Sequence, residues 1–141
     1  LKLLADKSIA NSRYTVIDWT SEEVDANGMH TTGANKSRIT IAETGYYYMA
    51  FLAVFEAANS GFREAMILKN GTTVLWKSSM STIGGGRDNV IACGFDYLSV
   101  GDYLTAQVWH NQGVSINLLY SDNGLPYKYA YSRFEAIKLN P

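Results

Sequence analysis

The sequence of 141 residues is poor in the residues that most metal and disulfide sites need, with one cysteine and two histidines, and it has only two prolines. A single cysteine excludes a disulfide within the chain. The apolar surroundings of Cys93 in DNVIACGFDYL favour a buried structural thiol over a nucleophile. One cysteine and two histidines are also too few for a zinc site. We therefore expect no metal and no cofactor.

The chain also has almost no net charge: its formal net charge is −1. This balance gives no electrostatic reason to expect nucleic acid or an anionic membrane as partner. The chain starts at Leu1 rather than methionine, which is compatible with upstream sequence, and shows no signal peptide. No apolar run reaches the length of about 20 residues that a membrane span needs. We expect neither nucleic-acid binding nor membrane insertion.

Aromatic residues are plentiful, and they gather in Thr44 to Ala58, which reads TGYYYMAFLAVFEAA. As a strand, this segment has two apolar faces: one with Tyr46, Tyr48, Ala50, Leu52 and Val54, and one with Tyr47, Met49, Phe51, Ala53 and Phe55. The adjacent tyrosines after a Thr-Gly turn favour a strand, while the alanines keep a buried helix open. Other stretches alternate apolar with polar residues, as strands covered on one side do. A small domain with one core buries only one face of this strand, so we expect the other to meet a second subunit or a partner.

The rest of the chain reads as short strands separated by turns. Asn70-Gly71 between two β-like runs predicts a tight hairpin, because both central positions of a type I′ turn need positive φ. Ser78 to Asn89 is expected to be a loop. The expected strands are Tyr14–Trp19, Ser37–Glu43, Phe62–Lys69, Thr72–Lys77, Asp88–Leu98, Tyr103–His110, Val114–Tyr120 and Tyr129–Leu139. The pattern predicts an all-β antiparallel sandwich or jelly roll over residues 14–141. Residues 1–13 form an entry segment or stalk remnant, either a short amphipathic helix or a first strand.

The ordered motifs resemble the globular head of the C1q and tumour-necrosis-factor superfamily. They are Asp25-Ala26-Asn27-Gly28, Ile39-Thr40-Ile41, Gly45-Tyr46-Tyr47, Leu68-Lys69-Asn70-Gly71, Leu98-Ser99-Val100-Gly101-Asp102-Tyr103-Leu104 and Phe134-Glu135-Ala136-Ile137-Lys138-Leu139. Met49 and Ala136 depart from the phenylalanine and glycine usual in that superfamily. The resemblance implies a ten-strand jelly roll that assembles as a homotrimer around aromatic side chains. We expect the trimer interface to use Tyr47, Met49, Phe51, Phe55, Trp109 and Tyr103.

No pattern of catalytic residues is present. His30 and His110 lack a positioned nucleophile signature such as G-x-S-x-G, and they read as turn or surface residues. The acidic residues Asp18, Glu22, Glu23 and Asp25 match no EF-hand, and we interpret them as a solvated face, with a calcium site as the alternative. We expect no enzyme; a glycosidase with paired carboxylates is a distant alternative.

Two loops are candidates for ligand contacts. Gly84-Gly85-Gly86-Arg87 lacks the ending of a P-loop, but such a loop suits contact with a receptor or a neighbouring protein through Arg87. Exposed tyrosines offer contact area at low entropic cost; we favour subunit packing as their role, with ligand contact as the alternative. The candidates are Tyr120, Tyr127 and Tyr129.

These features together predict a non-enzymatic, trimeric structural and binding module displayed on a surface. Asn59 to Gly71 is similar in style to heads of bacteriophage and bacterial surface proteins, which favours a phage virion protein, either a fibre or spike head or a capsid decoration. Its partners would be its own copies, other virion proteins, and a host receptor or glycan. The alternative is a secreted recognition protein or ligand of the C1q or tumour-necrosis-factor type. The location would be the virion surface or the extracellular space.

Overall fold

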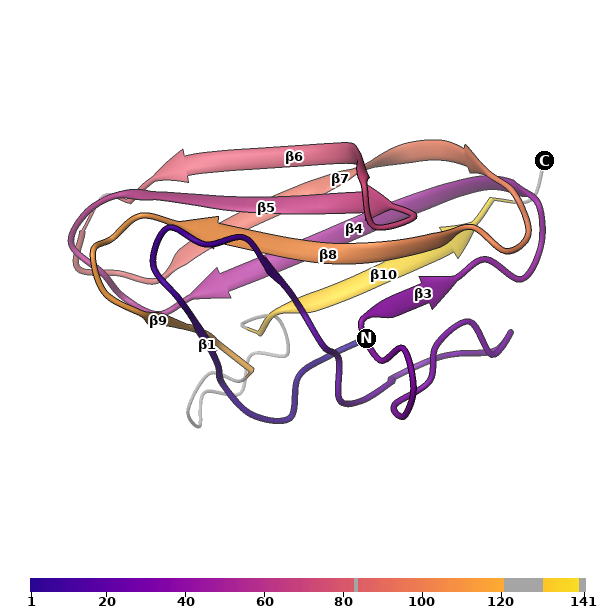
Figure 1. Ribbon diagram of the computed structural model, residues 1–141, viewed down its shortest axis with the longest axis horizontal. Helices are drawn as coiled ribbons and strands as arrows, with labels where there is room; N and C mark the ends of the chain where they lie inside the picture. Colours follow the sequence, from indigo (N-terminus) through magenta and orange to yellow (C-terminus); the bar gives the residue numbers. More distant parts are fainter. Residues whose placement is uncertain (83, 121–130, 140–141) are drawn as a thin grey trace.

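The computed structural model describes residues 1–82, 84–120 and 131–139, and every regular element in this part of the chain is a β-strand (Figure 1). None of the described residues belongs to a helix of the length and apolar character needed to cross a membrane. The strands are β1 (Lys7–Ile9), β2 (Thr15–Val16), β3 (Arg38–Thr40), β4 (Gly45–Phe55), β5 (Phe62–Lys69), β6 (Thr73–Ser81), β7 (Asp88–Leu98), β8 (Tyr103–His110), β9 (Ile116–Leu118) and β10 (Arg133–Lys138). The predicted all-β class is confirmed.

The first sheet is built around β4, as the two-faced apolar segment suggested. β7 pairs antiparallel with β4 along its whole length, from Gly45 opposite Leu98 to Phe55 opposite Asp88. On the other side, β10 pairs with Tyr47 to Leu52 of β4, and β9 pairs with its end and with β1. The expected strand at this position is confirmed, and β4 is the central strand of its sheet.

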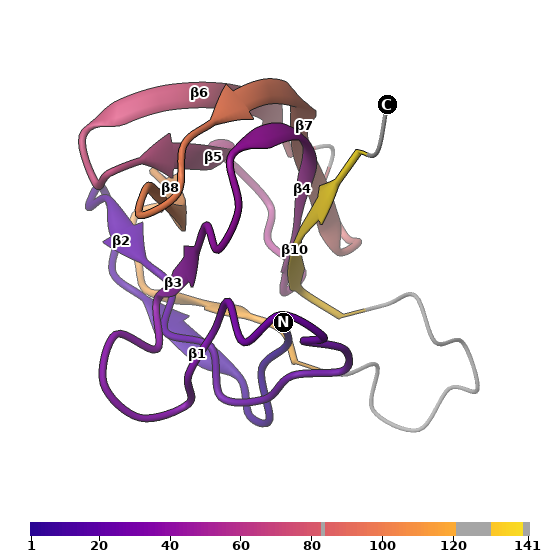
Figure 2. The ribbon, with the colours of Figure 1, turned by 90° about the vertical axis from the view of Figure 1, so that its right-hand side faces the viewer.

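The second sheet is built around β8. β5 pairs along one side of β8, and β2 and β3 share the other side. β6 forms the outer edge beyond β5, joined to it by the predicted hairpin, in which Asn70 and Gly71 have φ of 52° and 73°. A bulge between Ile67 and Leu68 shifts the register of the β5–β6 pair. The two sheets lie face to face as a sandwich (Figure 2).

The core lies between the sheets and has aromatic rings at its centre. Trp19 lies 5.9 Å from Phe51 and 5.9 Å from Phe134, measured between ring centroids, and all three side chains are fully buried. Burial of side chains this large supplies a substantial part of the free energy of folding, about 1.5–3 kcal/mol for each apolar residue taken from water. One chain therefore contains a complete core.

The first thirteen residues include a strand. β1 pairs with β9, and Leu3 and Ile9 are buried in the core of the sandwich. Of the two forms left open for this segment, helix or first strand, the structure has the strand. Of the expected strand Tyr14–Trp19, only Thr15 and Val16 form the ladder of β2, since the chain then turns inward to bury Ile17 and Trp19.

The segment after the hairpin is more regular than its serine-rich sequence indicated. β6 continues to Ser81, so the loop predicted from Ser78 is wrong over its first four residues. As an edge strand with exposed positions on its outer side, β6 does not need the apolar alternation that identifies half-buried strands. Its Trp76 lies against Gly94 of β7, where a Cβ atom would be only 2.1 Å from Trp76 Cε2.

Candidate functional site

The outer face of the sheet formed by β10, β4 and β7 brings together five exposed large hydrophobic side chains: Tyr46, Ile91, Phe95, Tyr97 and Ile137. Because side chains alternate along a strand, the antiparallel register places Tyr46 beside Tyr97, Tyr48 beside Phe95 and Leu52 beside Ile91. The rings of Tyr46 and Tyr97 are 5.1 Å apart, and those of Tyr48 and Phe95 are 5.2 Å apart. We call these three pairs, together with Ala50, Cys93 and Ile137, the outer aromatic face.

Most of these side chains are open to water in the single chain. Tyr46 is 61% exposed, Phe95 59%, Ile91 54% and Tyr97 52%. β4 and β7 place no charged side chain on this face, since their outward positions are occupied by tyrosine, phenylalanine, small and aliphatic residues and Asn89. On β10, Arg133 and Glu135 lie on the same face, opposite Leu52 and Ala50. Contiguous apolar surface of this kind usually marks a site of interaction.

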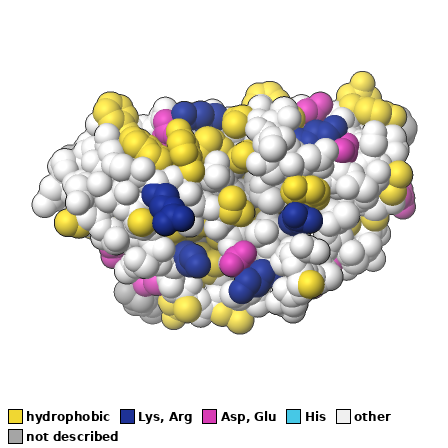
Figure 3. Space-filling view, viewed as in Figure 1, with side chains coloured by type: hydrophobic (Ala, Val, Ile, Leu, Met, Phe, Trp, Pro, Cys, Tyr) yellow, Lys and Arg dark blue, Asp and Glu magenta, His cyan; other side chains and the backbone are white. Residues whose placement is uncertain are grey.

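The opposite face of the sandwich has a different character. Figure 3 shows the side of β5, β6 and β8, where basic and acidic side chains are interspersed with separate apolar ones. Tyr14 lies 6.1 Å from Trp109 between ring centroids, and the Arg38 guanidinium lies 3.9 Å from the centre of the Tyr103 ring. Trp109 and Tyr103, both expected at the interface, are therefore on the other side of the molecule from the outer aromatic face.

The remaining predicted interface residues occupy the core. Tyr47 is 1% exposed, and Met49, Phe51 and Phe55 are fully buried within one chain. The prediction of two apolar faces on this strand is right, but the face chosen for the interface is the inner one. The inner face carries the purely apolar rings, and the Tyr47 hydroxyl finds an internal acceptor, donating to the Glu43 carbonyl at 2.7 Å. The hydroxyls of Tyr46 and Tyr48 fit a face that water reaches.

Cys93 is also placed differently from the prediction. It is exposed rather than buried, on the outer aromatic face opposite Ala50. The sequence shows apolar neighbours on both sides of Cys93, but these neighbours alternate between the core and the outer face.

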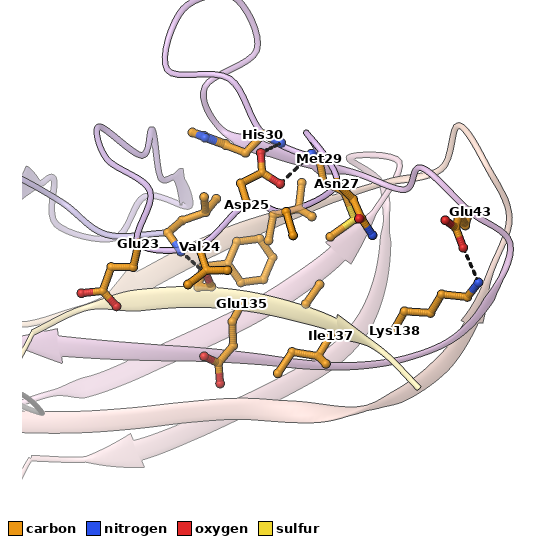
Figure 4. Close-up of a pocket in the computed structure, with 15 residues that line it drawn as sticks. Glu23, Val24, Asp25, Asn27, Met29, His30, Glu43, Glu135, Ile137 and Lys138 are labelled. Atoms are coloured by element: carbon orange, nitrogen blue, oxygen red, sulfur yellow. Dashed lines mark hydrogen bonds and ion pairs between the residues drawn. The ribbon is translucent and has the colours of Figure 1, made fainter. Parts of the chain in front are cut away.

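A pocket of about 660 Å³ opens at the edge where β3 and β10 flank the sandwich (Figure 4). The loop from Glu23 to His30 covers it. Asp25 fixes this loop, because its carboxylate accepts hydrogen bonds from the backbone N–H groups of Met29 and His30 at 2.8 and 3.0 Å. His30 is buried, with Nδ1 2.8 Å from Glu22 Oε1 and Nε2 3.0 Å from the Lys36 carbonyl.

Carboxylates outnumber lysines around this pocket. Glu43 accepts a hydrogen bond from Lys138 Nζ at 2.6 Å, which lowers the pKa of Glu43 and raises that of Lys138. Hydrogen bonds from the Tyr131 hydroxyl and from Lys2 lower the pKa of Glu23. The acidic residues that the sequence grouped together have separate partners: Asp18 pairs with Lys36, Glu22 with His30 and Glu23 with Lys2. The described residues contain no group of three or more potential ligands placed to hold a metal ion.

The fold can be compared with solved structures now that its geometry is known. It is similar to that of murine APRIL at pH 5.0, a TNF-family protein, with a TM-score of 0.65 and 14% sequence identity; the likeness covers 96% of this chain and 98% of that chain. The fold is a TNF-like jelly roll. At this identity the likeness concerns the fold alone. No protein-family model and no curated protein matches the sequence.

The predicted ligand residues of this jelly roll fall into two groups. Arg87 is exposed just before β7, and Tyr120, 38% exposed, follows β9. Asp88 and Leu118 both pair with Phe55, so the two segments flank the same end of β4. Tyr127 and Tyr129 lie outside the described residues. A role for any of these residues in ligand contact remains a prediction.

Proposed function

We propose that this chain is a non-enzymatic binding module that assembles as a homotrimer through its outer aromatic face. The observation that carries the proposal is the apolar, uncharged surface that β4 and β7 present to water on the side away from the core. Association through such a face desolvates few polar groups and removes a large apolar area from water. The TNF-like fold supports a non-enzymatic module.

We further propose that the module is displayed on a surface, where three linked copies of a weak contact would act at high effective concentration. The similarity of Asn59 to Gly71 to phage surface heads supports a virion protein, a fibre or spike head or a capsid decoration, with a host receptor, a glycan or other virion proteins as partners. A secreted recognition protein of the C1q or tumour-necrosis-factor type is the alternative. An image of the particle or complex that carries the chain distinguishes the two.

Sedimentation equilibrium of the purified chain tests the assembly. We expect trimers at micromolar concentration, and monomers for the variant Phe95→Asp, because a carboxylate in the interface would be buried without a partner. Circular dichroism should show that this variant keeps its fold, since Phe95 points away from the core.

The matched control is Phe62→Asp. Phe62 is 53% exposed, close to the 59% of Phe95, but it lies on β5 and its register places it on the face opposite the outer aromatic face. The control variant should remain trimeric. A monomeric wild-type chain, or equal loss of assembly in both variants, would contradict the proposal.

Cys93 supplies a second readout of the same contact. The thiol lies within the outer aromatic face and is exposed in the single chain. A thiol-specific reagent should therefore modify it slowly in the assembled wild type and rapidly in the Phe95→Asp variant. Equal rates in the two proteins would place the contact elsewhere.

A further inference from the structure

β10 is an edge strand, because in its sheet it pairs only with β4. The Leu139 N–H donates to the Tyr46 carbonyl at 2.8 Å, so the odd-numbered residues of this segment direct their backbone groups toward β4. These directions alternate along a strand of an antiparallel ladder. The backbone groups of Phe134, Ala136 and Lys138 therefore face the other way, toward the free edge.

The start of the chain occupies one end of this edge. The Leu1 ammonium donates to the Phe134 carbonyl at 2.7 Å, and the Phe134 N–H donates to the Leu1 carbonyl at 3.1 Å. Two residues that exchange both bonds form the hydrogen-bonded pair of an antiparallel ladder. Lys2 continues this pairing through an antiparallel bridge with Arg133. The edge of β10 thus already accepts a strand in antiparallel orientation, but over two residues only.

Beyond Phe134 the edge of β10 is open. Within the described part of the chain, the backbone N–H and C=O groups of Ala136 and Lys138 have no hydrogen-bond partner. A strand that continued the register of Leu1 and Phe134 would place two further hydrogen-bonded pairs here, opposite Ala136 and Lys138. A row of unpaired backbone groups is a template for adding a strand from another chain.

The pocket at the edge of the sandwich lies beside this open part of β10. Figure 4 shows the loop from Glu23 to His30 on one side of the pocket and β10 on the other. Its apolar lining includes Met29, Ile39, Phe134 and Ala136. Paired residues of an antiparallel ladder point their side chains to the same face. A residue added opposite Ala136 would therefore direct its side chain into this pocket.

We propose that an extended peptide segment of a partner protein binds here as an additional strand, antiparallel to β10. Its backbone pairs with Ala136 and Lys138, and an aliphatic side chain opposite Ala136 fills the apolar part of the pocket. The backbone bonds supply affinity, and the pocket selects the side chain. The occupant is a polypeptide because its backbone repeats a donor and an acceptor at every second residue, as this edge does. The proposal does not depend on self-association through the outer aromatic face.

Amide hydrogen exchange of the purified chain, followed by two-dimensional NMR, tests whether the edge is open. We expect the amides of Ala136 and Lys138 to exchange at least about tenfold faster than those of Glu135 and Ile137, which face β4. Equally slow exchange at all four positions would show that something, such as a second copy of the chain, already covers the edge. That result would overturn the proposal.

The probe for the added strand is the peptide acetyl-Ser-Thr-Val-Thr-Leu-Thr-amide. Titration with it should give saturable shifts at Met29, Ile39 and Ala136, and should slow the exchange of the Ala136 and Lys138 amides. With leucine opposite Ala136, the leucine and valine N–H groups point at β10 and the threonine N–H groups point away. N-methylation of the leucine should weaken binding about tenfold or more, because a hydrogen bond is lost and its acceptor is left unpaired.

The matched control is the same peptide N-methylated at the threonine that precedes the leucine, which should bind nearly as well as the parent. Replacing the leucine by aspartate should abolish saturable binding, because an unpaired carboxylate would enter the apolar pocket. Equal losses for the two methylated peptides, or no saturable binding of the parent peptide, would overturn the proposal. These peptides need no variant of the chain.

Ala136→Pro tests the edge from the side of the protein. The substitution removes an N–H that β4 does not use, and proline is tolerated in edge strands where the N–H side faces solvent. Circular dichroism should show an intact fold, and the parent peptide should no longer saturate; undiminished binding by the folded variant would overturn the proposal. Sedimentation equilibrium measures assembly separately, so failure at this edge is distinguishable from failure of the trimer proposal.

Discussion

His110 joins two parts of the chain through a neutral imidazole. Its Nε2 donates to the Ile9 carbonyl at 3.0 Å, and its Nδ1 accepts from the Gln112 N–H at 3.4 Å, an arrangement that only the neutral ring can make. Burial lowers the pKa of His110, and the positive charge of Arg63 lowers it further, against the opposing effect of the Ile9 carbonyl. Asp88, whose Oδ2 lies 3.3 Å from Arg63 Nε, is the anion paired with that guanidinium.

This geometry predicts how stability depends on pH. Because the pKa in the folded state lies below the ordinary value of 6.5, the unfolded chain binds the proton more tightly. The contribution of His110 is therefore complete above pH 6.5 and is lost as the pH falls toward the folded pKa, with a slope of at most about 1.4 kcal/mol per pH unit. Urea unfolding across this range should show a steeper decline for wild type than for His110→Gln. Parallel profiles would show that His110 is not responsible.

Single residues also mark where the sequence is informative and where it is not. The positive φ values at Asn70 and Gly71 follow from local chemistry, and the hairpin is where it was predicted. The exposure of Cys93 depends on which face of β7 meets the core, which no local pattern near Cys93 reveals. His110 was interpreted as a turn or surface residue, yet it is fully buried. The residues around it, Ile9, whose carbonyl accepts its hydrogen bond, and Arg63, which lies opposite it in the β5–β8 ladder, are distant in the sequence, so no local pattern reveals the burial.

At the scale of elements, β4 shows both the strength and the limit of a pattern. Its length, its aromatic content and its two apolar faces predict a central strand, and the structure confirms it. The prediction assigned the interface to the face that is buried in the core, because both faces are hydrophobic. The two faces differ in the hydroxyl groups they carry, and which one is buried also depends on the residues that the second sheet packs against it. Tyr46 and Tyr48 leave their hydroxyls near water, whereas Met49 and Phe51 have none to satisfy.

The contact between β6 and β7 depends on one glycine. A methyl group at position 94 would overlap the indole of Trp76, so Gly94→Ala should displace the ring and destabilise the fold by about 1–3 kcal/mol. Tryptophan fluorescence should shift to longer wavelength as the ring becomes more solvated.

A double-mutant cycle separates this contact from the intrinsic effect of replacing glycine. In a Trp76→Ala background the same substitution meets no ring, and it should cost little or even stabilise, since alanine suits an element interior better than glycine does. Chemical denaturation of the four proteins measures the cycle. Additive costs would show that Trp76 and position 94 do not interact.

At the scale of the whole molecule, the order of motifs along the chain predicted the jelly roll through its resemblance to the C1q and tumour-necrosis-factor superfamily, and the structure has that fold. The pocket was not predictable in this way. Its walls come from Leu1, the loop at Glu23 to His30, β3 and β10, and nothing in the sequence places these segments together. β10 was noticed only as a terminal motif, and whether its second edge is covered depends on strands far away in the sequence.

Assembly should also couple to stability. If trimers unfold to single chains, each tenfold increase in protein concentration stabilises the folded state by about 0.9 kcal/mol per subunit, two-thirds of RT ln 10. The melting temperature of the wild type should therefore rise with concentration, and that of Phe95→Asp should not. Differential scanning calorimetry over a hundredfold range of concentration makes the comparison. A wild-type melting temperature independent of concentration would argue against the trimer.

The bulge between Ile67 and Leu68 interrupts the ladder that joins β5 to the edge strand β6. Fibrils grow by adding strands to straight, continuous margins, and a displaced residue beside β6 makes that margin a poor template. If copies associate through the outer aromatic face as we propose, that surface is buried in a closed assembly and offers no site for further copies. We therefore expect the protein to stay a small, discrete oligomer at high concentration.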